Sequence, residues 1–136
     1  MDLAQRFALS AHNKFNQTES MRFALEHQNP PISGWLRQGS GFPEQTDSLL
    51  GVTNPKLLLW SLKVAEDGAE KGIVTRFWNL SDQPEEYQVQ LKSAMRGAWT
   101  TTHTERDLAA LPVLGNGVNA KAAAHQIQTL RLEPRP

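Results

Sequence analysis

Residues 85–93 read EEYQVQLKS, and this strict alternation of polar and apolar residues is the strongest constraint on the fold. Successive side chains of a β-strand point to opposite faces, so Tyr87, Val89 and Leu91 would share one side. A strand of this kind buries one face against a second layer and keeps the other face in water. The pattern therefore predicts an antiparallel sheet that is covered on one side by another layer.

Other segments also predict strands, because they are rich in apolar, β-branched or aromatic residues and are bounded by turn residues. These segments are residues 6–12, 48–52, 56–66, 72–80, 96–104 and 125–133. One short helix is predicted from about Glu19 to about Gln28, because Pro30 and Pro31 stop it there. Residues 33–46 and 115–123 contain several turn-forming residues and are predicted to be loops.

Together these elements predict an all-β fold, an antiparallel β-sandwich of about 6–8 strands with one short helix near the N-terminus. A chain of 136 residues fits one domain with one core, so we expect a single domain over residues 1–136. Residues 133–136, at the end of the last predicted strand and beyond it, are expected to form a loose tail.

The composition argues against several classes of protein. The chain has 14 Lys and Arg residues and 14 Asp and Glu residues, so it lacks the basic excess of a nucleic-acid binder. It has no cysteine, which excludes disulfides, thiolate zinc sites and cysteine nucleophiles. No apolar run approaches the roughly 18 residues of a membrane span, and the N-terminus lacks the features of a signal peptide. We therefore expect a cytoplasmic chain without nucleic-acid or membrane partners.

The sequence predicts no catalytic residue, no metal site and no cofactor site in this chain. Its serines occur in no G-x-S-x-G setting, and its four histidines lack the spacing that brings ligands together. Adjacent carboxylates such as Glu66 and Asp67 fit a solvated turn better than an acid–base pair. Trp35, in a Gly-rich loop, is the candidate for stacking on a sugar, whereas the other tryptophans are predicted to lie in the core or at an interface.

Arg76 raises a separate question, because it lies within the otherwise apolar stretch GIVTRFWN. Alternation places Arg76 on the same face as Val74 and Trp78. A buried guanidinium needs a partner that offsets its desolvation, and Glu66 or Asp67 at the neighbouring strand end is predicted to supply one. Alternatively, the guanidinium reaches a separate domain.

Four segments in order resemble one known family. Residues 59–79, LWSLKVAEDGAEKGIVTRFWN, resemble the pattern S-x-L/A-K-x-A-E-D-G followed by a strand ending R-x-x-N in the C-terminal β-sandwich of α-mannosidases of glycoside hydrolase family 38. RFALSAH is similar to an early strand of that domain, AMRGAWTTTHTERDL to the strand that leads into its acidic stretch, and HQIQTLRLEP to its closing strand. The resemblance extends from about residue 5 to residue 134.

The resemblance implies a non-catalytic accessory or structural domain of an α-mannosidase-like glycoside hydrolase. It implies a structural or domain-interface role for five residues: Lys63, Glu66, Asp67, Arg76 and Asn79. In that family the zinc ion and the aspartate nucleophile belong to an N-terminal catalytic domain, which would be the partner of this chain. The chain resembles the end of such an enzyme, and its apparent start within a strand suggests a cut.

Two other functions remain open from the sequence. A stand-alone carbohydrate-binding module would use exposed aromatic residues, and a domain that mediates assembly would carry an exposed apolar patch and associate with itself.

Overall fold

The computed structural model describes residues 7–34 and 46–135, and Trp35 therefore lies outside the described residues. The helical elements are α1 (Gln17–Gln28) and the short 3-10 helix η1 (Ala69–Lys71). The strands are β1 (Leu50–Val52), β2 (Leu57–Val64), β3 (Ile73–Asn79), β4 (Glu85–Leu91), β5 (Met95–Thr101), β6 (Asp107–Ala110), β7 (Val113–Leu114), β8 (Gly117–Ala122) and β9 (Ile127–Pro134).

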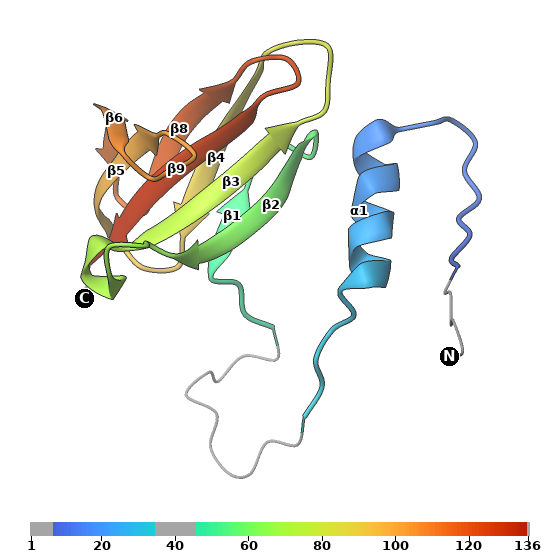
Figure 1. Ribbon diagram of the computed structural model, residues 1–136, viewed down its shortest axis with the longest axis horizontal. Coiled ribbons are helices and arrows are strands. Elements are labelled where there is room, and N and C mark those ends of the chain that lie inside the picture. The colour runs from blue at the N-terminus through green and yellow to red at the C-terminus, as the bar shows by residue number, and fades with distance from the viewer. Residues whose placement is uncertain (1–6, 35–45, 136) are drawn as a thin grey trace.

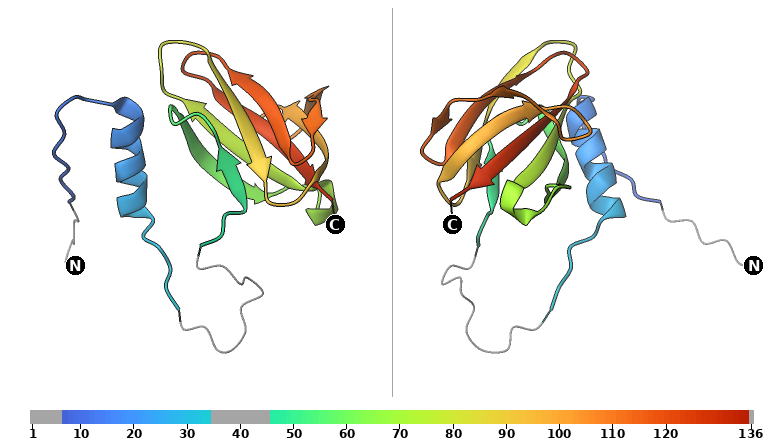
Figure 2. Two further views of the ribbon diagram at one scale, coloured as in Figure 1. Left: turned by 180° about the vertical axis from the view of Figure 1, so that it is seen from behind. Right: turned by 60° about the vertical axis from the view of Figure 1, so that its left-hand side comes forward.

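The strands form two antiparallel sheets that pack as the layers of a β-sandwich (Figure 1). One sheet has four strands in the order β1-β4-β8-β7, and the other has five in the order β2-β3-β9-β5-β6. The view from behind shows the four-stranded sheet in front (Figure 2). The predicted fold class is confirmed, and the nine strands found in the described residues slightly exceed the predicted 6–8.

An apolar core fills the space between the two sheets. Phe77 on β3 meets Tyr87 on β4 with ring centroids 5.2 Å apart. The alternation that predicted β4 is confirmed, because Tyr87, Val89 and Leu91 are all buried. Both sheets contribute the other buried members of the core, Leu57, Met95, Ala98, Val118, Ala122, Leu130 and Leu132. Burial of this apolar surface is the main favourable contribution to folding.

Strand β3 shows how the core sets the direction of the outer side chains. Phe77 points into the core, so its neighbours Arg76 and Trp78 point to the outer face of the five-stranded sheet. On that face Trp60 of β2 meets Trp78 edge-on, with centroids 5.3 Å apart. A bulge between Leu59 and Ser61 in the β2–β3 pairing brings Trp60 to the outer face as well.

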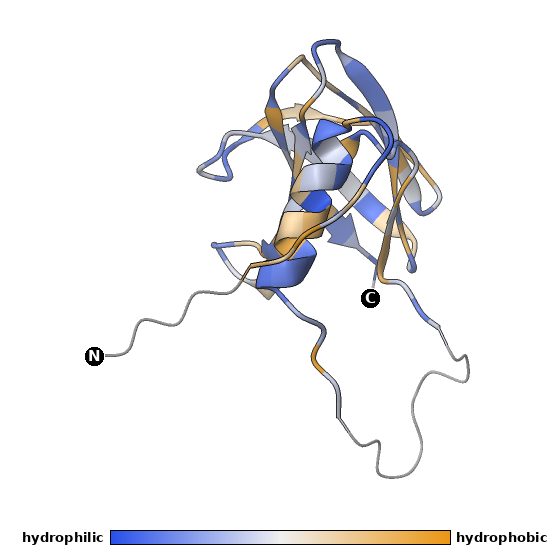
Figure 3. Ribbon diagram, turned by 90° about the vertical axis from the view of Figure 1, so that its right-hand side faces the viewer, coloured by the Kyte–Doolittle hydropathy of each residue, from blue (hydrophilic) through white to orange (hydrophobic). Residues whose placement is uncertain are grey.

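Helix α1 contacts the sandwich near the start of β2. Asn16 caps the helix by accepting a hydrogen bond from the Glu19 N–H (3.1 Å), and the helix ends before Pro30. Thr18 Oγ1 and Arg22 Nη2 donate to the carbonyls of residues 56 and 55. Seen side-on, α1 lies in front of the sandwich and mixes polar with apolar residues (Figure 3). No helix among the described residues is long and apolar enough to cross a membrane.

The strand predicted at residues 6–12 is not found in its described part, residues 7–12. Phe7 and Leu9 are exposed, and no neighbouring strand pairs with this segment. Local composition alone does not make a strand, because its backbone N–H and C=O groups need a paired partner. The segment instead runs outside the sandwich before α1 (Figure 1).

Two other segments were predicted to lie outside the strands but are partly in strands. Residues 115–123, predicted to be a loop, contain β8, and only the turn at Gly115 (φ 67°) between β7 and β8 has the predicted character. Pairing with β4 and burial of Val118 override the weak strand propensity of β8. Part of the predicted tail is also paired, because Glu133 and Pro134 lie opposite Gly97 and Met95.

Candidate functional site

The hairpin of β2 and β3 contains the residues predicted to form a structural or interface motif, namely Lys63, Glu66, Asp67, Arg76 and Asn79. Its turn includes η1 and uses two glycines with positive φ, Gly68 (118°) and Gly72 (94°). A Cβ atom at Gly72 would lie only 2.2 Å from the carbonyl oxygen of Leu132 on β9. The glycine therefore allows the end of the hairpin to approach β9 closely.

Arg76 reaches from the outer face of β3 across β9 to the turn after β5. Its Nη1 donates to Ser61 Oγ on β2 at 3.2 Å, and its Nη2 donates to the carbonyl oxygen of His103 at 3.0 Å. The same Nη2 lies 3.5 Å from a carboxylate oxygen of Glu105. The side chain is about four-fifths buried, so these partners replace most of its lost hydration.

Glu105 is the acceptor on which the donors of this face converge. Its carboxylate accepts from Lys63 Nζ and from the Glu66 backbone N–H, both at 2.8 Å, and it faces Arg76. Only 9% of its side chain is exposed. Its φ of 65° is unusual for a residue with a Cβ atom, at a typical cost of about 1–3 kcal/mol. The converging donors offset that cost.

Glu66 and Asp67 are therefore not the partners of Arg76, contrary to the prediction. Arg76 lies opposite Ser61 in the β2–β3 pairing, so the carboxylates of the turn lie beyond its reach. The Glu66 carboxylate instead accepts from Lys63 Nζ at 2.5 Å, while Asp67 is exposed beside a shallow cavity of about 350 Å³. Sequence reasoning missed Glu105 as the partner, because its only local signal is an acidic residue in a turn.

The contacts of Glu105 hold its carboxyl in the charged form. Burial alone would raise the pKa of Glu105, but hydrogen bonds from Lys63 and from the Glu66 N–H, with the charges of Lys63 and Arg76, lower it below its ordinary value. The hydrogen bond to Glu105 raises the pKa of Lys63 in turn. A carboxylate held ionised by such partners is poorly suited to donate a proton at neutral pH.

We call Lys63, Arg76 and Glu105 the ion-pair clamp. It joins the β2–β3 hairpin to the turn between β5 and β6, and β9 lies between these two parts of the sheet. His103, whose carbonyl binds Arg76, also has its Nδ1 3.2 Å from Thr129 Oγ1 on β9. The clamp therefore stabilises the order of four strands on the outer face.

Asn79, at the end of β3, connects the turn after β3 to the end of β8 through its side-chain hydrogen bonds. Its side chain is fully buried, and its Nδ2 donates to the carbonyl oxygens of Gln83 (2.8 Å) and Ala123 (2.9 Å) and, at 3.4 Å, of Ala122. Its Oδ1 accepts from the backbone N–H and the hydroxyl of Ser81. One amide thus ties the turn after β3 to the end of β8 and links the two sheets.

A further ion pair, which the sequence reasoning did not find, lies on the same outer face beside the clamp, where Arg131, Asp107 and Glu105 line one cavity. Arg131 on β9 donates to both carboxylate oxygens of Asp107 on β6 (2.9 and 2.5 Å) and to the carbonyl of Lys71. Its guanidinium also stacks 4.0 Å from the ring centre of Trp99. The hydrogen bonds from Arg131 lower the pKa of Asp107.

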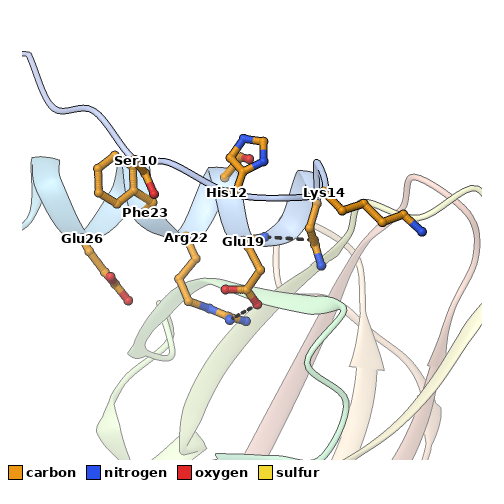
Figure 4. A pocket seen from close by; sticks show the side chains of 9 residues that line it. Ser10, His12, Lys14, Glu19, Arg22, Phe23 and Glu26 are labelled. Carbon is orange, nitrogen blue, oxygen red and sulfur yellow. Dashed lines mark hydrogen bonds and ion pairs between the residues drawn. The ribbon is translucent and has the colours of Figure 1, made fainter.

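Another cavity of the described residues lies away from the clamp. It has a volume of about 490 Å³ and lies between α1 and the preceding segment, where Arg22 pairs with Glu19 (Figure 4). The side chains of His12, Lys14 and Glu26 around it are exposed to solvent. No group of three or more His, Asp or Glu side chains within residues 7–34 and 46–135 has an arrangement that would hold a metal ion.

The model of the glycosyl hydrolases family 38 C-terminal beta sandwich domain matches residues 56–130, which is more than half of the chain. The match begins just before β2 and ends within β9, so it includes the clamp and Asn79. A search of curated proteins found no match.

Replacing Asn79 with Ala should destabilise the fold by about 2–3 kcal/mol, because buried carbonyl oxygens lose their donor. The exposed Asn119, replaced with Ala, serves as the control and should change stability by less than about 0.5 kcal/mol. Urea unfolding followed by Trp fluorescence measures both changes. Equal unfolding midpoints for the two variants would contradict the role given to Asn79.

Replacing Arg76 with Leu should lower the free energy of unfolding by about 1.5–3 kcal/mol, the usual range for a hydrogen bond to a charged group. The loss is limited because Glu105 keeps its hydrogen bonds from Lys63 and Glu66. Thermal unfolding compares this variant with Arg106→Leu, in which an exposed arginine changes. A melting temperature within a degree or two of the unsubstituted protein would argue against a stabilising Arg76.

The clamp should also make stability depend on pH. The folded pKa of Glu105 is depressed, so its contribution is present at neutral pH and is lost as the pH falls through that pKa, below about 4.5. Glu105→Gln removes the charge at every pH and should be less stable than the unsubstituted protein at neutral pH. The difference between their urea midpoints should shrink on acidification, whereas Glu26→Gln should show no such trend. A difference that grows at low pH would disprove this linkage.

Proposed function

Because the chain belongs to the family of glycosyl hydrolase family 38 C-terminal β-sandwich domains, we propose that it is a non-catalytic accessory domain of an α-mannosidase. The match over residues 56–130 carries this proposal, since it includes the five-stranded sheet almost entirely. The partner would be the catalytic portion of such an enzyme. Hydrolysis of the α-mannosidic bond would take place there, with one carboxylate as nucleophile and a second carboxyl group as acid and base.

The geometry of the predicted motif supports a structural role. The polar side-chain atoms of Lys63, Arg76 and Asn79 bind strands and turns of the same domain. Glu66 pairs with Lys63, and Asp67 lies exposed in the turn. We assign zinc to the catalytic portion, as the membership of family 38 implies.

A stand-alone carbohydrate-binding module is the second candidate, and the tryptophans of the described residues give it little support. Trp60 is 45% exposed, but its ring is nearly perpendicular to that of Trp78, at 87°, so the pair is no flat platform for a sugar. The Trp99 ring is already stacked by Arg131. The role considered for Trp35 stays a prediction.

The proposal predicts that this chain alone does not hydrolyse a chromogenic α-mannoside, with or without added zinc. Fused to a family 38 α-mannosidase that lacks its own C-terminal sandwich, the chain should restore zinc-dependent turnover. The same fusion carrying Asn79→Ala should restore less at elevated temperature. Zinc-dependent turnover by the chain alone would overturn the non-catalytic role. Quenching of Trp fluorescence that saturates with mannosides would favour the carbohydrate-binding alternative.

A further inference from the structure

Strand β2 is the longest edge strand in the described part of the chain. It has eight residues, whereas the other edge strands, β6, β1 and β7, have four, three and two. Its core-facing side chains are also incompletely covered, with Leu59, Leu62 and Val64 exposed by 39%, 41% and 53%. A long apolar edge of this kind is a template for pairing with another strand.

The same three residues direct their backbone groups to the free edge. The Ala65 N–H bonds the carbonyl of Gly72 across the hairpin, and hydrogen-bonded pairs alternate in antiparallel strands, so Leu62 and Val64 point away from β3. Asn79 directs its N–H to Gln126, on the β9 side. Its partner in β2, Leu57, therefore directs its carbonyl to the free edge, while its N–H donates to the Asn54 carbonyl at 3.2 Å. Leu59, two residues later, also points to the free edge.

The bulge at Trp60 gives this edge a self-complementary pattern. In a regular strand, a twofold axis between two residues would place core-facing side chains opposite outward-facing ones. The bulge adds one residue to β2, so Leu59 and Leu62 both lie on the core side although they are three positions apart. The mismatch is thereby removed. An axis between Trp60 and Ser61 then places Leu59 opposite Leu62 of a second copy and Leu57 opposite its Val64.

Charge does not protect this edge. Lysine on an edge strand usually opposes pairing, but the Lys63 ammonium is held by Glu66 and Glu105. The formal net charge of zero also means that two copies repel each other little. Helix α1 bonds the carbonyls of residues 55 and 56 and contacts the start of β2, and the rest of the strand runs away from the helix towards η1 (Figure 1).

We propose that β2 pairs antiparallel with β2 of a second copy of this chain, so that the two five-stranded sheets form one continuous sheet. Leu59 forms a hydrogen-bonded pair with Leu62 of the other copy, and the Leu57 carbonyl accepts from the Val64 N–H of the other copy. The inference goes beyond the accessory role and is independent of it. If the fusion did not restore turnover, or if the chain alone hydrolysed the mannoside, the proposed interface would still stand. A monomeric chain, in turn, would not argue against the accessory role.

Sedimentation equilibrium of the full chain tests the interface. The unsubstituted protein should show a monomer–dimer equilibrium, and Val64→Lys should raise the dissociation constant by at least about tenfold, because a free charge at an edge opposes strand pairing. Leu114→Lys, an equally drastic change at the exposed edge strand β7, is the matched control and should dimerise normally. A monomer at every accessible concentration, which would leave the edge for a strand of another protein, overturns the proposal. A Val64→Lys variant that dimerises as tightly as the control does the same.

Cross-linking tests the register without depending on a destabilising charge. The chain has no cysteine, so Ser61→Cys introduces a single thiol beside the proposed axis. Across that axis the two Ser61 positions are close neighbours, within the Cα separation of about 4.4–6.8 Å that a disulfide needs. Mild oxidation should therefore give a covalent dimer of Ser61→Cys and little or none of Leu114→Cys. Equal yields from the two variants, or no dimer from Ser61→Cys, would overturn the register.

Discussion

The packing of Phe77 against Tyr87 between the two sheets is the contact on which the rest of the structure depends. Side chains alternate along a strand, so burying Phe77 commits its neighbour Arg76 to the outer face. The guanidinium there is still largely buried, and it needs acceptors from neighbouring strands. The hydrophobic core thus determines the position of the polar clamp, and the clamp in turn fixes the hairpin against the turn that carries Glu105.

The sequence predicted those elements whose own residues show an alternating or continuously apolar pattern. Alternation in residues 85–93 located β4, and apolar runs located β2, β3 and β9. It failed for β8, whose small and polar residues form a strand only because β4 and β7 flank them. It failed for residues 7–12, where strand-like composition finds no partner. In both cases the outcome depends on neighbours that are distant in the sequence, and local propensity contains no information about them.

The candidate site shows the same limit more sharply. The hairpin motif was visible because its polar residues interrupt an apolar strand, and a buried Arg76 demands an acceptor. The acceptor itself, Glu105, lies 29 positions further along the chain, since 105 − 76 = 29. In the turn that carries it, its backbone adopts a positive φ, which residues with side chains rarely do. The local sequence of a turn does not reveal that conformation, so the nearer carboxylates, Glu66 and Asp67, were the natural but wrong choice.

The clamp and the free edge of β2 are connected through Lys63. A lysine in an edge strand ordinarily extends into solvent, where its charge resists pairing with other strands. Here the two carboxylates of Glu66 and Glu105 draw the ammonium back onto the outer face. The interactions that hold the hairpin in place therefore also remove the charge that would protect its edge. Internal stability and an exposed pairing surface are two consequences of the same ion pairs.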